Sequence, residues 1–310
     1  MKAKGRANYQ LPLTRLKSFL DHLKRMKRPW IKYCTYVKNI IDHYDEIILL
    51  KPSEFEVYYN QYFNGLSEKE LEKSVFYKDK CRPFYEWLVY CMRYDEARSK
   101  KLIQYIRLMG IKTCVYCNAQ YATTFVSDDE TFAIYDLDHV WPKSKYPFLC
   151  TSFFNLVPSC PYCNKLKSDN GTVFNLYTED WHAIEPFRFV LDKESIIRYF
   201  LSNHSEDLVV KMTASDAGNT IVAAKYNEQL HIDQRYSTHT DVVEELIWKS
   251  RIYNESYRQQ LQEAFDKLFP DANVTLDFER LYKGYYTAPS DVHKRPLTKM
   301  LQDIGSGLGL

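Results

Sequence analysis

Apolar residues recur at helical spacing along the first third of the chain. Between Thr14 and Pro29 they form one stripe, with Lys and Arg on the other faces, made of Leu16, Phe19, Leu20, Leu23 and Met26. Thr14 is a suitable N-cap, and Pro29 ends the pattern. The string SEKE at positions 67–70 is a capping box, which predicts the start of another helix. Because helical spacing continues to Gly110, residues 1–110 are predicted to be mostly helical.

The pattern changes after Gly110. The string ATTFVSDDETFAIYDLDH contains two β-prone stretches around a polar turn at positions 127–130, which predicts a hairpin. Farther along, Asp241 and Glu244 form a second capping box, and the apolar spacing after it predicts one long amphipathic helix ending at Pro270. The predicted fold class is α+β: a mainly helical protein with a small central mixed module. The predicted segments are 1–110, 111–175 and 176–310.

Charge is distributed unevenly along the 310 residues, although the net charge is only +2. The first 33 residues contain ten Lys or Arg and a single acidic residue, Asp21. This basic segment suits a polyanionic partner, but it is equally typical of a solvated helix face. The many aromatic residues, 26 Tyr and 17 Phe, are expected in the core, with some as stacking surfaces for bases.

Several classes of protein are excluded by composition. No run of 18 apolar residues exists, so no membrane span is expected. The basic N-terminus has no following apolar segment, so no secretory signal is expected there. Eight cysteines are too few for a disulfide scaffold, so paired cysteines indicate metal in a protein expected to be cytoplasmic. Four of them, Cys34, Cys81, Cys91 and Cys150, show no pairing and are expected to be ordinary thiols.

The other four cysteines form two Cys-x-x-Cys knuckles, CVYC (Cys114, Cys117) and CPYC (Cys160, Cys163). Two thiolates at this spacing can bind one ion from a single tight turn, and two knuckles complete the tetrahedron of sulfurs that zinc accepts. The alternatives are four unrelated buried cysteines or a redox pair. A zinc ion with four protein ligands would be structural, because no coordination position stays open for chemistry.

Polar residues suited to phosphodiester hydrolysis lie between and beside the knuckles. A neutral histidine such as His139 can take a proton from an attacking water near pH 7. Asp138 and Asn164 offer the carboxylate and amide oxygens that Mg²⁺ prefers, and Asn155 lies between them in the sequence. Phosphates flanking the scissile one would meet the nearby lysines, which are Lys143, Lys145, Lys165 and Lys167.

Taken together, the pattern CVYCN … DLDHVWPKS … FNLVPSCPYCNKLKSDN resembles an HNH endonuclease of the ββα-metal (His-Me finger) group, in its zinc-stabilised form. The resemblance covers roughly positions 114–170, less than a fifth of the chain. It implies a ββα-metal module clamped by the four cysteines, with His139 as general base at the end of the first strand. It also implies that Asp138 and Asn164 hold a catalytic Mg²⁺ or Mn²⁺ and that Asn155, near the second strand, orients His139.

Each residue also has a structural interpretation. His139 could be a structural histidine, Asp138 a turn residue, Asn155 a turn residue and Asn164 an N-cap without metal. The lysines could be solvated surface charges. His182, in EDWHAIEP, is expected to be structural.

The flanks carry little functional signal. The strings AAKYNEQLHID and VHKRPLTKML are similar to tails of bacterial HNH proteins of anti-phage defence, including nucleases paired with an ATPase in Septu-like systems. No phosphate-binding Gly-Lys-Ser/Thr loop occurs in the chain, so ATP-driven control would need a partner ATPase. The predicted function is that of a metal-dependent endonuclease in anti-phage defence or restriction. DNA is the expected substrate. The alternatives are a zinc-stapled nucleic-acid-binding subunit without cleavage activity, and a nuclease silent until the ATPase binds.

Overall fold

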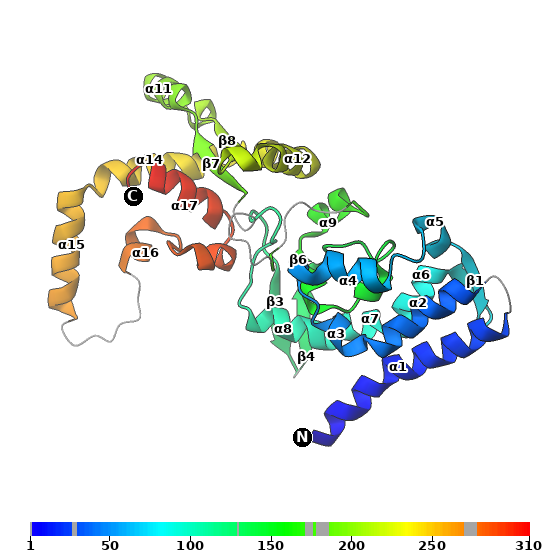
Figure 1. Ribbon diagram of the computed structural model, residues 1–310. Coiled ribbons are helices and arrows are strands. Elements are labelled where there is room, and N and C mark those ends of the chain that lie inside the picture. Colours follow the sequence, from blue (N-terminus) through cyan, green and yellow to red (C-terminus); the bar gives the residue numbers. More distant parts are fainter. Residues whose placement is uncertain (1, 27–29, 129, 171–175, 178–185, 270–277) are drawn as a thin grey trace. The chain divides into compact units, whose positions relative to one another are not determined.

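The computed structural model describes residues 2–26, 30–128, 130–170, 176–177, 186–269 and 278–310. Its contacts divide the chain into two compact units. The first unit contains residues 1–109 and 124–184, and the second contains residues 110–123 and 185–310 (Figure 1). The fold is α+β and mainly helical, with small antiparallel two-stranded sheets, as the sequence predicts. Among the described residues, no helix combines the length and the apolar character needed to cross a bilayer.

The N-terminal part of the first unit is a group of helices around an aromatic core. These helices are α1 (Lys2–Arg25), α2 (Ile31–Asp42), α3 (Tyr44–Ile48), α4 (Phe55–Tyr62), α5 (Glu68–Leu71), α6 (Phe84–Cys91), α7 (Tyr94–Ala97) and α8 (Ile103–Leu108), with the short turns η1 (Pro52–Glu54) and η2 (Arg98–Leu102). In the core, Phe63 stacks on Phe148 with ring centroids 4.0 Å apart. Phe84 and Trp87 are also fully enclosed, which accounts for part of the aromatic content of the chain.

The apolar stripe of the first helix is buried as predicted, because Leu16, Phe19 and Leu23 are fully buried in α1. The predicted start at Thr14 is wrong, since α1 already begins at Lys2 and has Pro12 inside it. Pro12 is buried on the same stripe, four residues before Leu16, so packing of its ring offsets the backbone hydrogen bond that proline cannot donate. The predicted end at Pro29 lies outside the described residues; α1 ends at Arg25.

The predicted capping box at Ser67 is confirmed. The Ser67 side chain accepts a hydrogen bond from the Glu70 backbone, and the Glu70 carboxylate accepts one from the Ser67 backbone. The helical prediction for residues 1–110 missed one element, the hairpin of β1 (Ser74–Tyr77) and β2 (Lys80–Pro83). It turns through Lys78 and Asp79, both with positive φ, a conformation for which this lysine gives no sequence signal.

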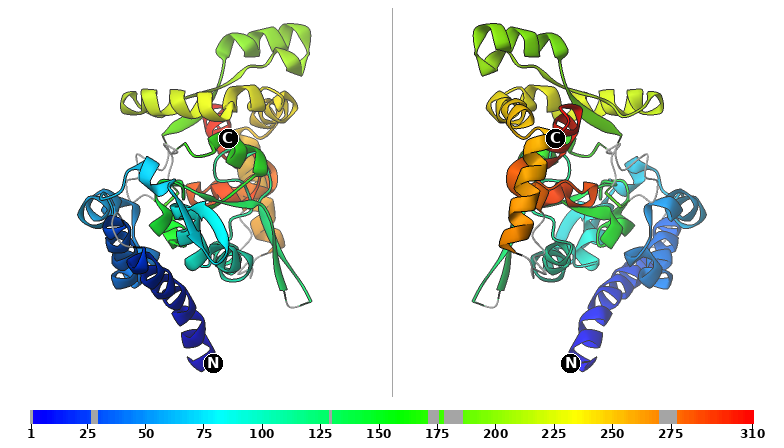
Figure 2. Two further views of the ribbon diagram at one scale, coloured as in Figure 1. Left: turned by 90° about the vertical axis from the view of Figure 1, so that its right-hand side faces the viewer. Right: turned by 90° about the vertical axis from the view of Figure 1, so that its left-hand side faces the viewer.

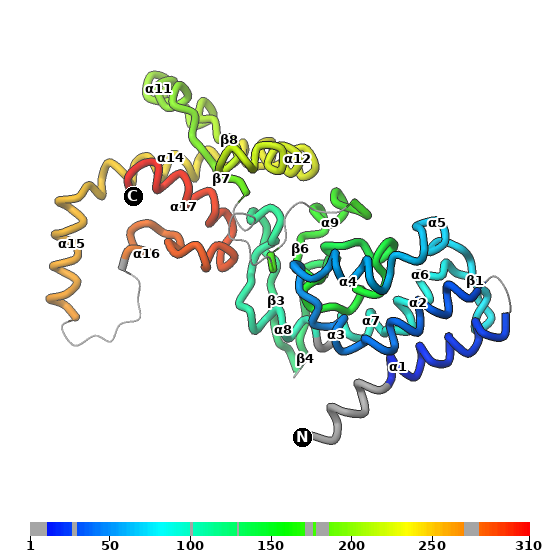
Figure 3. The backbone as a smooth tube through the Cα atoms, viewed as in Figure 1, coloured from blue at the N-terminus to red at the C-terminus, as the bar shows by residue number. Residues whose placement is uncertain are grey.

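The central part of the first unit contains two strand pairs and a helix. The predicted hairpin is confirmed as β3 (Thr123–Ser127) and β4 (Glu130–Ile134), which extends away from the rest of its unit (Figure 2). The chain then forms β5 (Asp136–His139), the short turns η3 (Pro147–Leu149) and η4 (Phe153–Asn155), β6 (Leu156–Ser159) and α9 (Pro161–Lys167). Strands β5 and β6 pair antiparallel, and α9 contacts β5. Figure 3 shows the chain passing from β6 into α9.

The second unit is built on one antiparallel pair, β7 (Phe187–Leu191) with β8 (Val210–Ala214). Its helices and short turns are α11 (Lys193–Ser202), η5 (Ser205–Asp207), η6 (Ala217–Asn219), α12 (Thr220–Leu230), α13 (Ile232–Tyr236), α14 (Thr240–Ile252), α15 (Glu255–Leu268), α16 (Phe278–Lys283), η7 (Pro289–Lys294) and α17 (Thr298–Gly307). Helix α17 lies against β7, and α12 against β8.

The single long helix predicted after Asp241 is wrong, because the structure has two helices there. Helix α14 begins at Thr240, so Asp241 lies in its first turn and does not cap it. Helix α14 ends at Ile252. After Tyr253, the Asn254 side chain caps α15 by accepting a hydrogen bond from the Tyr257 backbone at 3.1 Å. Pro270 and His182 lie outside the described residues.

Candidate active site and metal centre

The two cysteine knuckles are held by different local structures. Cys160 is the N-cap of α9, and its Sγ accepts a hydrogen bond from the Cys163 backbone at 3.5 Å. In the other knuckle, the Asn118 backbone donates to the Cys114 carbonyl at 2.9 Å and closes the turn, with Asn118 itself at φ 51°. The Tyr236 hydroxyl donates to the Cys117 carbonyl at 2.6 Å. Each knuckle is therefore a tight turn fixed by hydrogen bonds.

The four knuckle cysteines form a cluster. Their Sγ atoms all lie within 4.8 Å of one another, and all four residues are buried. Cys34, Cys81, Cys91 and Cys150 are not members of this cluster, and burial raises the pKa of Cys91 to about 12. Four sulfurs at this separation match the donor set and size of a tetrahedral thiolate site, so the cluster could bind a metal such as zinc.

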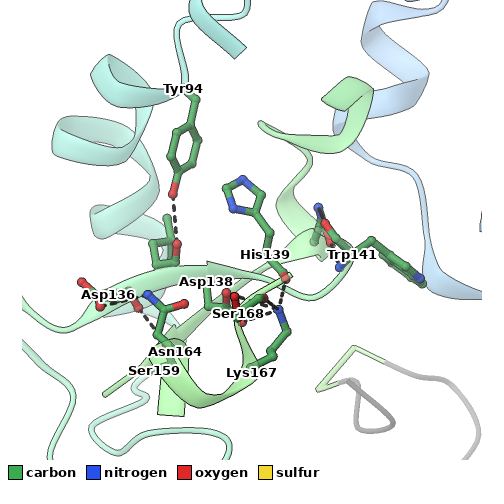
Figure 4. A network of polar contacts seen from close by, with 11 residues as sticks. Tyr94, Asp136, Asp138, His139, Trp141, Ser159, Asn164, Lys167 and Ser168 are labelled. Atoms are coloured by element: carbon green, nitrogen blue, oxygen red, sulfur yellow. Dashed lines mark hydrogen bonds and ion pairs between the residues drawn. The ribbon is translucent and has the colours of Figure 1, made fainter. Parts of the chain in front are cut away.

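A second cluster surrounds strand β5. Alternation along the strand places Asp136 and Asp138 on one face and His139 on the other (Figure 4). A cavity of about 190 Å³ nevertheless reaches both sets of side chains. Its lining consists of Tyr94, Arg98, Asp136, Leu137, Asp138, His139, Pro142, Lys143, Asn164, Lys167, Ser168 and Asp169. The structure thus brings together five of the predicted site residues, which are Asp138, His139, Lys143, Asn164 and Lys167.

His139 is the last residue of β5 and is buried. Its Nε2 lies 3.0 Å from the carbonyl oxygen of Cys150. Because a carbonyl only accepts, Nε2 carries a hydrogen, and the neutral ring keeps its lone pair on Nδ1. Burial lowers the pKa of His139 to about 3, with the nearby charges of Lys143, Lys167 and Arg98 acting in the same direction. The ring is therefore neutral at pH 7, which is the form that can accept a proton.

Asn155 is fully buried directly before β6, and its side chain makes three hydrogen bonds. Its Oδ1 accepts from the Trp141 backbone at 2.7 Å, and its Nδ2 donates to the carbonyls of Trp141 and Leu149, both at 3.1 Å. These two residues flank the ends of the loop that follows His139 and leads to Cys150. Asn155 therefore fixes the loop whose Cys150 carbonyl contacts His139, and it can position the histidine only through that loop.

Lys167 differs from the other predicted phosphate contacts. Its side chain is buried, and its Nζ lies 3.1 Å from Asp138 Oδ2 and donates to the His139 carbonyl at 2.7 Å (Figure 4). Lys167 thus lies inside the site, and its predicted contact with phosphate stays a prediction.

The remaining lysines are closer to the surface. Lys143 lines the cavity with its Nζ 5.2 Å from the centroid of the Tyr94 ring, and Lys165 is exposed. Lys145 pairs with Glu68 at 3.1 Å. Each of these charges is placed where solvent, and a ligand in solvent, can reach it.

The sequence did not identify Tyr94, Arg98 and Asp136, which also line this cavity. Tyr94 donates its hydroxyl to the Leu137 carbonyl at 2.9 Å, and Arg98 Nη2 lies 3.5 Å from Asp136 Oδ1. Both come from the helical part of the unit, far from the motif in sequence, so only the fold identifies them. Asp136 had a usable signal, because it lies two residues before Asp138 on a predicted strand.

Comparison of the chain with protein-family models, with curated proteins and with solved structures gave no match. The described residues define an α+β protein with a buried four-cysteine cluster and a separate cavity that combines carboxylates, an amide, a neutral histidine and cationic side chains.

Proposed function

We propose that this protein is a metal-dependent endonuclease of the HNH type, which hydrolyses phosphodiester bonds in nucleic acid, with DNA as the expected substrate. One observation carries the proposal. The cavity of about 190 Å³ gathers Asp138, His139 and Asn164 with the cationic side chains of Arg98, Lys143 and Lys167. A nucleic-acid-binding module has no need of a neutral histidine beside two oxygen ligands. This combination therefore favours a nuclease over a nucleic-acid-binding protein without cleavage activity.

His139 is the general base of the proposed reaction. The hydrogen that Nε2 donates to the Cys150 carbonyl leaves the lone pair on Nδ1, which can accept a proton from the attacking water. The water oxygen forms a bond to phosphorus while the bond between phosphorus and the 3′ oxygen breaks, and the departing 3′ oxygen takes a proton from solvent water. The products are a 5′-phosphate end and a 3′-hydroxyl end, by analogy with the family that the sequence resembles.

A divalent cation would be held by the Asp138 carboxylate and the Asn164 amide oxygen. Both donors are hard oxygens, which fits Mg²⁺ or Mn²⁺ and does not fit a soft metal. When bound, such an ion stabilises the charge that develops on the phosphoryl group and the departing oxygen. Asp138 is held in place by Lys167, and Asn164 by Asp136.

The substrate backbone would meet the accessible cations of this unit. Arg98 and Lys143 line the cavity and suit the scissile and adjacent phosphates, while Lys165 lies exposed on α9 beside Asn164. Contacts to phosphate carry no sequence information, so they predict affinity without base specificity.

The four-cysteine cluster would hold a structural zinc ion. Cys160 and Cys163 begin the same helix, α9, that carries Asn164 and Lys167. A zinc ion there would fix the start of this helix, and hence the position of the amide and the ammonium relative to β5. Because four thiolates close the coordination sphere, this ion would take no part in the hydrolysis.

Cleavage of supercoiled plasmid by the zinc-loaded protein tests the proposal. We expect nicking and linearisation with Mg²⁺ or Mn²⁺, none with EDTA, and at least about 100-fold slower cutting by Asn164→Ala. End-labelling should find 5′-phosphates. Loss of cutting in Asn164→Ala with no change in His204→Ala, which alters an exposed histidine outside the site, would separate the site from a contaminant.

Failure to cut would contradict the proposal for the isolated chain. Zinc-loaded protein that binds DNA without cutting it under any metal would favour the nucleic-acid-binding subunit. Cutting that begins only when an ATPase is added would favour the partner-gated nuclease. A role in anti-phage defence or restriction, expected from the C-terminal strings, stays a prediction.

A further inference from the structure

Asp136 lies in the candidate site with its two carboxylate oxygens directed to different partners. Its Oδ2 accepts a hydrogen bond from Asn164 Nδ2 at 3.0 Å (Figure 4), and its Oδ1 lies 3.5 Å from Arg98 Nη2. Asp136 precedes Asp138 by two residues on β5, so both carboxylates are on the same face of the strand. Asn164 comes from α9, and its bond to Asp136 therefore joins the helix to the strand.

The chemistry of this contact determines which way the Asn164 amide faces. A carboxylate can only accept a hydrogen bond, so the amide must turn its NH₂ group toward Asp136. The amide is planar, and its oxygen is then directed away from Asp136. A cation is ligated by an amide oxygen and never by an amide NH₂ group. With the opposite orientation, Asn164 would present the wrong atom to a cation.

We propose that Asp136 is a positioning residue that orients the Asn164 amide so that its oxygen is available to a divalent cation in the site. The inference rests on the proposed function, because it concerns the same cation. Arg98 Nη2 lies 3.5 Å from the second carboxylate oxygen of Asp136, so each oxygen of this carboxylate has a partner beside the proposed cation site.

Binding of Mn²⁺ alone to the zinc-loaded full chain, followed by electron paramagnetic resonance without nucleic acid, tests the inference. Residues that orient metal ligands change metal affinity by about 10–100-fold, so Asp136→Ala should weaken Mn²⁺ binding at least about 10-fold. The matched control is Asp45→Ala, which removes an exposed aspartate of α3 and should bind Mn²⁺ like the wild type.

An exchange of the two side chains separates orientation from charge. In Asp136→Asn with Asn164→Asp, the new amide can donate to the new carboxylate, whose second oxygen stays available to the cation. In Asp136→Ala with Asn164→Asp, the charge at position 164 is the same but the hydrogen bond is gone. We expect the exchanged pair to bind Mn²⁺ at least about fivefold more tightly than the alanine pair, following the hydrogen bond that fixes the ligand.

The outcomes are distinct. If the wild type binds Mn²⁺ and Asp136→Ala binds it equally well, the inference is wrong while the proposed function stands. Equal affinity of the exchanged pair and the alanine pair would also overturn it, because charge alone would then explain the recovery. A wild type without any Mn²⁺ site would overturn both the inference and the proposed cation. Zinc content and circular dichroism of each variant check that the fold is kept.

Discussion

Replacing Lys167 with methionine removes a positive charge that the structure places directly beside the Asp138 carboxylate. The two side chains are 2% and 8% exposed, and Nζ lies 3.1 Å from Oδ2. The ammonium also donates to the His139 carbonyl at 2.7 Å. Methionine keeps much of the volume, so the variant tests the charge rather than the packing.

The expected cost follows from this burial. Removing one partner of a buried ion pair leaves an uncompensated charge and costs about 3–5 kcal/mol. For a folded unit of about 150–250 residues, each kcal/mol lowers Tm by roughly 2–4 °C. The first unit falls in this range, so Lys167→Met should lower its Tm by about 6–20 °C.

Thermal unfolding in zinc-containing buffer without Mg²⁺ measures the effect. The matched control is Lys24→Met, whose partner Asp21 lies 3.7 Å away in a pair with both side chains at least 60% exposed. Surface pairs are worth about 0–1 kcal/mol, so the control should shift Tm by at most a few degrees. Adding Asp138→Asn to Lys167→Met removes the carboxylate charge that Lys167 no longer balances, and this should recover part of the lost Tm.

Two results would refute this reasoning. One is a shift in Lys167→Met no larger than that of the exposed control. The other is a double variant that is as unstable as the sum of its two single variants, because independent costs would mean that Lys167 and Asp138 do not interact.

Three further predictions concern zinc, pH and phosphate. Cys160→Ser should lose bound zinc, measured by mass spectrometry of the metal, and unfold at lower temperature; full zinc content in the variant would contradict the cluster as a zinc site. Burial lowers the pKa of His293 to about 4, so the stabilising contribution of the neutral ring is present above pH 6.5 and is lost as the pH falls toward 4. Between pH 7 and 5, the Tm of the wild type should therefore drop more than that of His293→Gln. An equal drop in Tm for both proteins would contradict this. Lys165→Ala should weaken DNA binding severalfold and reduce the salt slope by about 1, whereas an unchanged slope would remove Lys165 from the phosphate contacts.

Features encoded in short stretches of sequence were predicted well. The Ser67 capping box and the strand turn near Asp128 depend on residues within a few positions of one another, and both are present. Elements that depend on distant partners were missed. Strands β7 and β8 pair across the whole of α11, so no turn signal joins them, and the β1–β2 hairpin turns through two non-glycine residues with positive φ.

The same distinction holds for the site. Asp138, His139 and Asn164 could be selected from spacing within one motif, and the structure places all three on one cavity. Tyr94 and Arg98 could not be selected, because they reach the cavity only through the packing of the helical region. The burial of Lys167 could not be predicted either. The sequence shows a basic residue at the end of a helix, but it does not show that the Asp138 carboxylate lies next to it.

The most direct test of the account is the single-turnover rate of DNA cleavage by His139→Ala in saturating Mg²⁺. Loss of a general base costs about 10²–10⁴-fold in rate, so we expect at least a 100-fold decrease while zinc content and Mn²⁺ binding stay at wild-type levels. The control His204→Ala should cut at the wild-type rate. A His139→Ala rate within threefold of the wild type would contradict the assignment of His139 as the base and, with it, the proposed nuclease site.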